Sequence, residues 1–162
     1  MSLPNWIERP NTVAFLLNPA FCGEVLKRGI IEYQKINKSG IPFQLIFLIL
    51  PIALNQSIRD ILPKSSRKGF ISWLEENQIL KKDLPQSIRA MVPYTKESLM
   101  FLMMYGIIEV EDNGMLKATK RNKSIKGNSE VTDCYKKAAL IGKLLAKAGS
   151  SQFIFTNIGI KP

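Results

Sequence analysis

A single run of apolar residues dominates the hydrophobic pattern of this chain. Residues 41–54 (IPFQLIFLILPIAL) contain eleven aliphatic or aromatic residues, two prolines and one glutamine, without any charge. A membrane-spanning helix needs about 20 such residues, so a re-entrant or interfacial membrane segment is the less favoured alternative. Since Leu and Phe outnumber Val and Thr, and the run is apolar on all sides, it predicts a core helix buried on every side. Pro42 suits the first turn of that helix, and Pro51 is expected to end or kink it near Leu50.

Shorter helices are predicted on both sides of this run. Asn18 and Pro19 are typical of a helix start, with Asn18 as the N-cap, and apolar residues then recur at near-helical spacing to about Lys35. Residues 11–17 are predicted to form a short helical or extended turn. Further helices are predicted over residues 57–62, 65–77, 84–91, 95–105 and 129–148, the last of them capped by Ser129 or Asn128. Residues 152–161 are expected to form a strand-like or docked tail.

A β-hairpin is predicted after residue 106, where the periodicity changes. Residues 107–110 and 115–118 are short strand candidates, and the Asn113-Gly114 pair between them is a strong hairpin signal. Short helices followed by a hairpin are the element order of a winged helix-turn-helix, with residues 95–105 in the place of the recognition helix. That segment is apolar, however, and Lys96 is its only cation, so it is not expected to read DNA bases.

The predicted fold is mainly α with a small β-hairpin: a helical bundle around a buried apolar helix, including a winged-helix-like module. A length of 162 residues suits one domain with a real core. We expect residues 1–162 to form a single domain in three parts. Residues 1–63 form a helical part with the core helix, residues 64–126 the winged-helix-like part, and residues 127–162 a C-terminal helix with its docked tail.

Positive charge is concentrated in the last third of the chain. The formal net charge is +10, of which residues 111–162 carry +6, from ten Lys and Arg against four Asp and Glu. The sharpest feature is the basic stretch 117–126 (KATKRNKSIK), which contains no acidic residue; its cations are Lys117, Lys120, Arg121, Lys123 and Lys126. Such a stretch can follow a nucleic-acid backbone without reading its sequence. The alternative is a solvated linker, because charge runs often indicate exposure alone.

The residues needed for general acid–base chemistry are scarce. The chain has no histidine, and its two cysteines lie far apart in apolar surroundings, so neither a common zinc site nor a Cys–His nucleophile is expected. Glu75 and Glu76 are adjacent and would point about 100° apart on a helix, so they do not form a catalytic pair. We therefore expect no enzymatic activity and no cofactor. Since no basic segment and cleavage site precede an apolar run near residue 1, we expect a cytoplasmic protein without a membrane segment.

Several apolar or small residues are instead candidates for contacts with partner proteins. The methionines of residues 95–105 are suited to adaptable packing, either in the core or at an interface. The small residues of the last helix allow another helix to approach closely, including one from another chain. The candidate interface residues are Met100, Met103, Met104, Ala139 and Gly142.

Motifs along most of the chain resemble the middle component of bacterial three-component ABC systems. The similarity covers the leader Glu8-Arg9-Pro10, residues 16–22, the apolar run with residues 59–63, and the ending, where residues 138–150 and 158–162 match. The positions that carry it most clearly are Asn18, Pro19, Phe21, Pro42, Pro51, Arg59, Pro63, Gly159 and Pro162. Because the similarity reaches both ends, we expect a complete small protein. One departure is Asn55, where relatives tend to have histidine.

This resemblance implies a non-enzymatic adaptor. Such components sit between an SMC-like ABC ATPase and an effector, often a nuclease, in defence against phage or plasmids of the Lamassu type, and are taken to contain a winged-helix-like module. The assembled complex, rather than this chain alone, would contact DNA. The rival interpretation from the residues is a winged-helix DNA-binding regulator that acts as a dimer, which would require a more polar recognition helix.

Overall fold

The computed structural model describes residues 2–161, and most of them are helical. The helices are η1 (Trp6–Glu8), α1 (Asn11–Leu16), α2 (Pro19–Asn37), α3 (Phe43–Ile46), α4 (Ile49–Leu54), α5 (Gln56–Asp60), α6 (Phe70–Glu76), α7 (Ile79–Met104), α8 (Glu130–Ala146) and α9 (Ser151–Ile158). The strands are β1 (Ile108–Val110) and β2 (Leu116–Ala118). The prediction of a mainly α fold with a small hairpin is confirmed.

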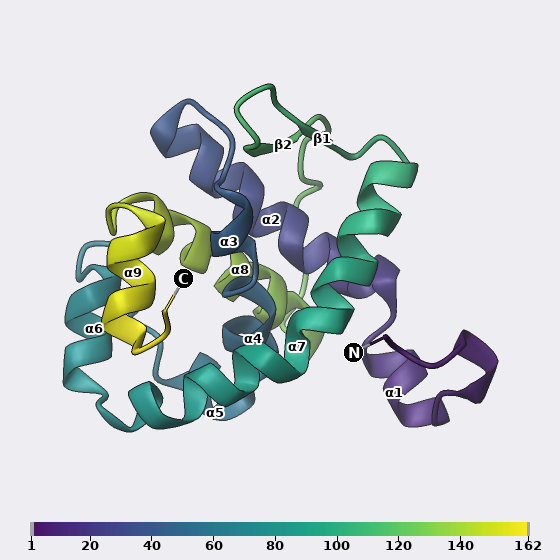
Figure 1. The fold of residues 1–162 in the computed structure, drawn as a ribbon, viewed down its shortest axis with the longest axis horizontal. Helices are drawn as coiled ribbons and strands as arrows, with labels where there is room; N and C mark the ends of the chain where they lie inside the picture. The colour runs from purple at the N-terminus through teal and green to yellow at the C-terminus, as the bar shows by residue number, and fades with distance from the viewer. Residues whose placement is uncertain (1, 162) are drawn as a thin grey trace.

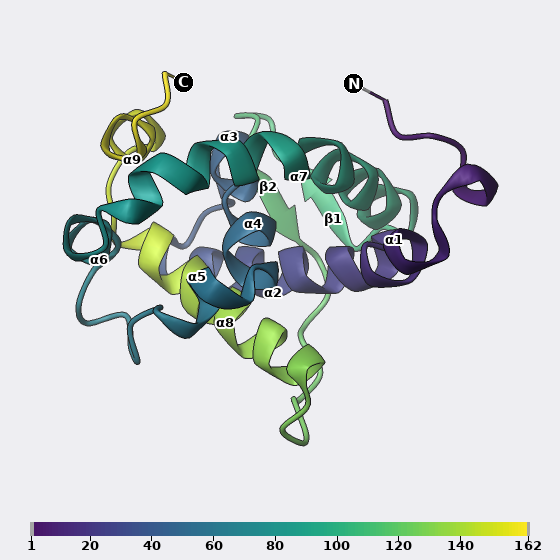
Figure 2. The ribbon, with the colours of Figure 1, turned by 90° about the horizontal axis from the view of Figure 1, so that it is seen from below.

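Three long helices enclose the apolar run. Figure 2 shows α4 between α7 on one side and the crossing helices α2 and α8 on the other, and α4 contacts all three. The helices α6 and α9 pack together near the start of α7, whereas the hairpin lies near its end (Figure 1). The segment before α2 projects from this body. No helix within residues 2–161 has both the length and the apolar character needed to cross a bilayer.

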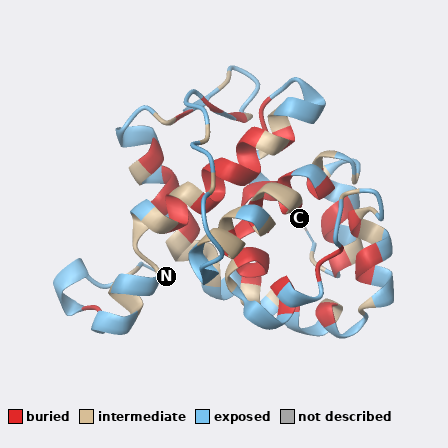
Figure 3. Cartoon of the chain, turned by 180° about the vertical axis from the view of Figure 1, so that it is seen from behind, coloured by how far each residue is buried: buried red, intermediate tan, exposed pale blue. Residues whose placement is uncertain are grey.

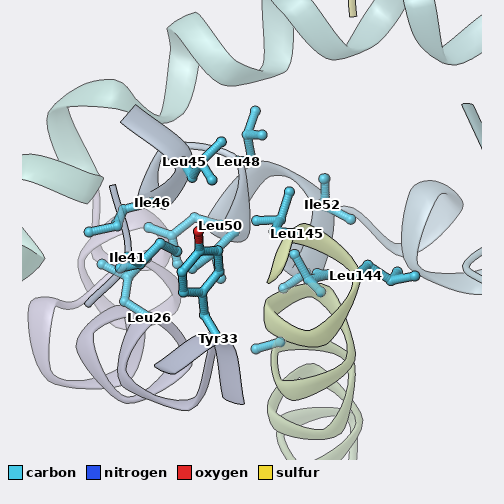
Figure 4. Close-up of a cluster of buried hydrophobic side chains, with 14 of the residues drawn as sticks. Leu26, Tyr33, Ile41, Leu45, Ile46, Leu48, Leu50, Ile52, Leu144 and Leu145 are labelled. Carbon is cyan, nitrogen blue, oxygen red and sulfur yellow. The ribbon is translucent and has the colours of Figure 1, made fainter. Parts of the chain in front are cut away.

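The apolar run is buried as predicted, but it is not one helix. Leu48 is fully buried, as are Leu45 and Ile46 of α3 and the aliphatic residues 49–53 of α4. Figure 4 shows Ile46 beside α2 and Ile52 beside α8, whereas Leu48 points the other way, toward α7. The chain leaves the helical path between α3 and α4, at Phe47 and Leu48. The prediction that Pro51 would end or kink the helix near Leu50 is wrong. The ring of Pro51 would clash with the carbonyl four residues earlier, at Phe47, so a new helix begins and places Pro51 in its first turn.

The helix α7 is a second correction, because two predicted helices are joined in one. Pro85 and Pro93 both lie inside this 26-residue helix, which changes direction along its length in Figure 1. Each proline costs a backbone hydrogen bond and bends the helix without ending it. Thr95, where the predicted helix 95–105 was expected to begin, is buried inside α7, and its hydroxyl donates to the carbonyl of Met91 at 3.0 Å. Residues 84–105 therefore form no helix–turn–helix, and the winged-helix arrangement is not confirmed.

The hairpin forms in the predicted place and is tied to the body. Its strands pair antiparallel, with Ile108 opposite Ala118 and Val110 opposite Leu116. Ile41, at the start of the apolar run, exchanges two backbone hydrogen bonds with Leu116, of 2.8 and 2.9 Å. The side-chain amide of Gln34 in α2 bonds both the N–H and the carbonyl of Ala118. The hairpin is therefore fixed to α2 and the core rather than free like a wing.

The boundaries of the other helices follow their capping residues. The side chain of Asn18 accepts from the N–H of Phe21 at 2.7 Å, which confirms the predicted start of α2, and Ser129 caps α8 as predicted. The predicted helix 65–77 begins only at Phe70. The tail is docked but helical rather than strand-like, because Ser150 caps α9 and its buried residues recur at helical spacing; they are Ile154, Phe155 and Ile158.

The helices α2 and α8 cross at a pair of glycines. A Cβ placed on Gly142 of α8 would lie 2.1 Å from the carbonyl oxygen of Gly29 in α2. On the other helix, a Cβ on Gly29 would lie 2.8 Å from the side chain of Ile49 in α4. The close approach predicted for the small residues of α8 thus occurs within the chain at Gly142, which is buried there.

Candidate partner-binding surface

The N-terminal arm, residues 2–17, is held against α7 by one arginine. The guanidinium of Arg9 donates to both carboxylate oxygens of Glu97 in α7, at 2.8 and 2.6 Å, and to the carbonyl of Pro4 at 3.0 Å. The central carbon of this guanidinium, Cζ, lies 5.0 Å from the ring centre of Trp6. The hydrogen bond to Glu97 raises the pKa of Arg9, so the guanidinium keeps its charge. A bidentate pair of this kind fixes orientation as well as position.

Apolar side chains of the arm face solvent. Ile7 is 96% exposed, Phe15 78% and Leu16 63%. Figure 3 shows the arm projecting from the body with most of its surface exposed. A groove of about 530 Å³ runs between α1 and the body; its lining includes Phe15, Leu16, Leu17, Phe21, Leu54 and Val131. Exposed apolar residues gathered around a groove are typical of a surface that binds another protein.

The predicted interface methionines lie at the end of α7, beyond Glu97, the residue that holds the arm. Met100 is 70% exposed, Met104 74% and Met103 39%, and Tyr105 next to them is 57% exposed. Residues three, four and seven apart share one face of a helix, so Met100 and Met104 share a face with Glu97, which holds the arm. The Arg9–Glu97 pair therefore joins the arm to the helix that carries these methionines, whereas Figure 1 shows the two segments in different places, the arm beside the start of α2 and the end of α7 beside the hairpin. We call the arm and residues 100–105 together the apolar surface.

Sequence reasoning missed the arm as part of this surface. Residues 11–17 (NTVAFLL) were expected to form only a short helical or extended turn. The feature that could have indicated a partner-binding segment is their run of uncharged apolar residues directly before the helix start at Asn18. The other two candidate interface residues, Gly142 and Ala139, lie elsewhere in the structure. Gly142 is buried at the crossing with α2, and Ala139 is half-buried beside lysines of α8. Neither belongs to the apolar surface.

Arg59 ties three helices together. It is 3% exposed, and it donates to Asp133 of α8 at 2.8 Å, to Glu130 of α8 at 3.1 Å and to the carbonyl of Ala53 in α4 at 3.0 Å. A guanidinium can satisfy three acceptors in a fixed geometry, whereas the single nitrogen of a lysine could not reach all three from this position. Asn55 caps α5 by accepting from the N–H of Ile58. Both residues are therefore structural.

The remaining motif positions mostly start or end elements. Pro19 is the first residue of α2, Pro42 directly precedes α3 and Gly159 ends α9 with a left-handed backbone, φ 89°. Phe21 packs against the ring of Tyr135, with 5.9 Å between ring centres. Pro63 is buried after α5. Pro162 lies outside the described residues.

The basic stretch 117–126 has an irregular backbone after β2 and is largely exposed. The carbonyl of Lys123 accepts from the guanidinium of Arg28 in α2, at 3.2 Å, which fixes the middle of the stretch. Lys117 stands opposite Glu109 in the hairpin register. It therefore has an acidic neighbour that the sequence pattern did not show. The other four cations, Lys120, Arg121, Lys123 and Lys126, are exposed.

The cysteines are buried in the core. Burial raises the pKa of Cys22 to about 12 and also raises the pKa of Cys134, so both thiols are protonated at neutral pH. Residues 2–161 contain no group of three His, Cys, Asp or Glu side chains placed to hold a metal ion.

A small helical protein that exposes an apolar surface has the character of a subunit that is completed by other chains. Residues 6–162 match the family model of the ABC-three component (ABC-3C) system Middle Component 3, and the chain belongs to this family. A middle component implies partner subunits within an ABC system. Comparisons with curated proteins and with solved structures find no match.

Proposed function

We propose that this middle component is a non-catalytic adaptor that links an SMC-like ABC ATPase to an effector subunit. The effector is nuclease-like, and the system acts in bacterial defence against phage or plasmids, of the Lamassu type. The adaptor holds the effector inactive until foreign DNA is sensed. The observation that supports this proposal is the apolar surface, because the arm and the end of α7, which the Arg9–Glu97 pair connects, both expose large side chains.

The character of this surface fits a protein partner. Stable interfaces bury about 800 Å² on each side, with an apolar centre and a polar rim. Methionine and aromatic residues are enriched at such centres, and the flexible Met side chains adapt to more than one partner surface. Here Met100 and Met104 would supply the centre, while Lys96 and the Arg9–Glu97 pair lie at its edge. Release of the effector would follow a conformational change in the ATPase that alters this interface.

A matched pair of variants on α7 tests the apolar surface. Met100 and Ile79 have nearly equal exposure, 70% and 69%, but lie near opposite ends of the helix. Met100→Asp would bury a carboxylate in the interface and should weaken co-purification with the neighbouring subunits at least tenfold, or about 1.4 kcal/mol. Ile79→Asp makes the same chemical change outside the apolar surface and should leave the yield unchanged. Equal yields from the two variants would contradict the assignment.

We also propose that the basic stretch 117–126 contacts a nucleic-acid backbone within the assembled complex, without sequence preference. Replacing Lys117, Lys120, Arg121, Lys123 and Lys126 by Ser should weaken DNA binding by the complex. Each lost phosphate contact reduces the steepness of the plot of log K against log salt by about 0.9. Loss of the four cations without an acidic neighbour should therefore reduce this steepness by up to about 3.6. The measurement is the salt dependence of DNA binding by the purified complex. An unchanged slope would leave the stretch as a solvated linker.

A further inference from the structure

A second basic surface lies between α8 and the connection from α5 to α6. Figure 2 shows this connection, residues 61–69, passing beside α8. The two segments enclose a hollow of about 480 Å³. Its lining residues are Lys64, Ser65, Ser66, Asp133, Lys136, Lys137, Ala139, Leu140 and Lys143. We call it the basic hollow; it shares no residue with the basic stretch 117–126.

The lysines of the basic hollow come together because of helical spacing. Lys136, Lys143 and Lys147 are seven and four residues apart, so they lie along one face of α8. The ammonium group of Lys147 bonds the hydroxyl of Ser66 at 3.0 Å, which fixes the connection against this face. Lys64 adds a charge from the opposite wall. The sequence pattern showed these residues of α8 only as the polar side of an amphipathic helix.

The positive charge of the hollow is not neutralised within the described chain. Asp133 is its single lining carboxylate, and the guanidinium of Arg59 binds it at 2.8 Å. Lys143 lies 3.5 Å from Glu32. Among residues 2–161, however, Lys64, Lys136 and Lys137 have no carboxylate within 4.0 Å. Three ammonium groups thus converge on one concave surface without a counter-charge.

We propose that the basic hollow binds the phosphate backbone of duplex nucleic acid. From Lys136 to Lys143, the first and last lysines of α8 in the lining, the helix rises about 10 Å, a length of B-DNA that carries about six phosphate charges. The hydroxyls of Ser65 and Ser66 can donate to phosphate oxygens. No aromatic side chain lines the hollow to stack an unpaired base, which favours a duplex over a single strand. Lysines alone supply charge without base readout, so binding is independent of sequence. This inference does not depend on the adaptor role.

Two matched pairs of adjacent lysines test the basic hollow. Lys136 and Lys137 line it, whereas Lys81 and Lys82 lie on α7; in each pair one residue is exposed and the other is half-buried. The full-length chain is titrated into a labelled duplex of about 20 base pairs, and fluorescence anisotropy is followed over a range of salt concentrations. Lys136→Gln with Lys137→Gln should weaken binding at least tenfold and lower the salt slope by about 1.8. Lys81→Gln with Lys82→Gln removes the same charge and should have little effect.

Other results would overturn this inference. Equal losses in the two double variants would mean that only net charge matters, and an absence of binding by the wild-type chain at about 50 mM salt would remove the site altogether. If polyglutamate of matched charge binds the hollow as tightly as the duplex does, the hollow is a site for acidic protein segments instead. Retained binding by Lys136→Arg with Lys137→Arg would support the backbone site. Loss of the adaptor role would appear in co-purification and leave this assay unchanged.

Discussion

Leu48→Asp is expected to leave the chain unfolded or insoluble. Leu48 is fully buried where the chain passes from α3 to α4, between α7 and the α2–α8 pair. An unpaired carboxylate there costs several kcal/mol, a large part of the roughly 5–15 kcal/mol that stabilises a typical domain. The measurement is the soluble yield, together with thermal unfolding followed by circular dichroism.

Gln44→Asp is the control for this substitution. Gln44 lies four residues earlier in the same run but is exposed, so the change should alter the free energy of unfolding by no more than about 0.5 kcal/mol. A soluble Leu48→Asp variant with a normal melting temperature would mean that the apolar run is exposed, and that the helices do not pack around it.

Gly142→Ala should be strongly destabilising although alanine is the better helix former. The added methyl group would lie 2.1 Å from the backbone oxygen of Gly29, which cannot move without separating α2 from α8. The higher helix propensity of alanine stabilises the folded state by about 1 kcal/mol, whereas forcing its methyl group against the backbone of Gly29 costs about 3 kcal/mol or more. The net loss of about 2 kcal/mol should lower the melting temperature by roughly 4–8 °C.

Gly23→Ala provides a matched comparison. Gly23 is also a buried glycine within a long helix, so the gain in propensity is the same, but its added methyl group would meet the side chain of Leu102 at 3.1 Å. A flexible side chain can shift by a few tenths of an ångström, so this variant should remain within about 1 kcal/mol of the wild type. Equal melting temperatures for the two variants would contradict the close crossing at Gly29 and Gly142.

Features set by local chemistry could be predicted from the sequence. The Asn18 cap, the Ser129 cap and the Asn113-Gly114 hairpin each depend on a few neighbouring residues. Burial of the apolar run follows from its composition, because eleven apolar residues without a charge favour the protein interior over water.

Features set by packing between distant segments could not be predicted in this way. Pro51 begins α4, whereas Pro85 and Pro93 lie within α7, and the difference depends on what each helix packs against. The residue types of α8 were compatible with a crossing to another chain, and only the position of Gly29 shows that the crossing is internal. The apolar surface and the basic hollow each combine segments that are far apart in the sequence, so no local pattern indicated them.

Co-expression with the neighbouring subunits of its ABC system tests the adaptor proposal most directly. The chain is tagged, purified by affinity and passed through size exclusion, and the co-eluting subunits are identified and quantified. The adaptor proposal predicts one assembly that contains the chain, the SMC-like ATPase and the effector. Elution of the chain as a stable monomer or homodimer free of both would contradict it, and a homodimer that binds DNA with sequence preference would favour the regulator.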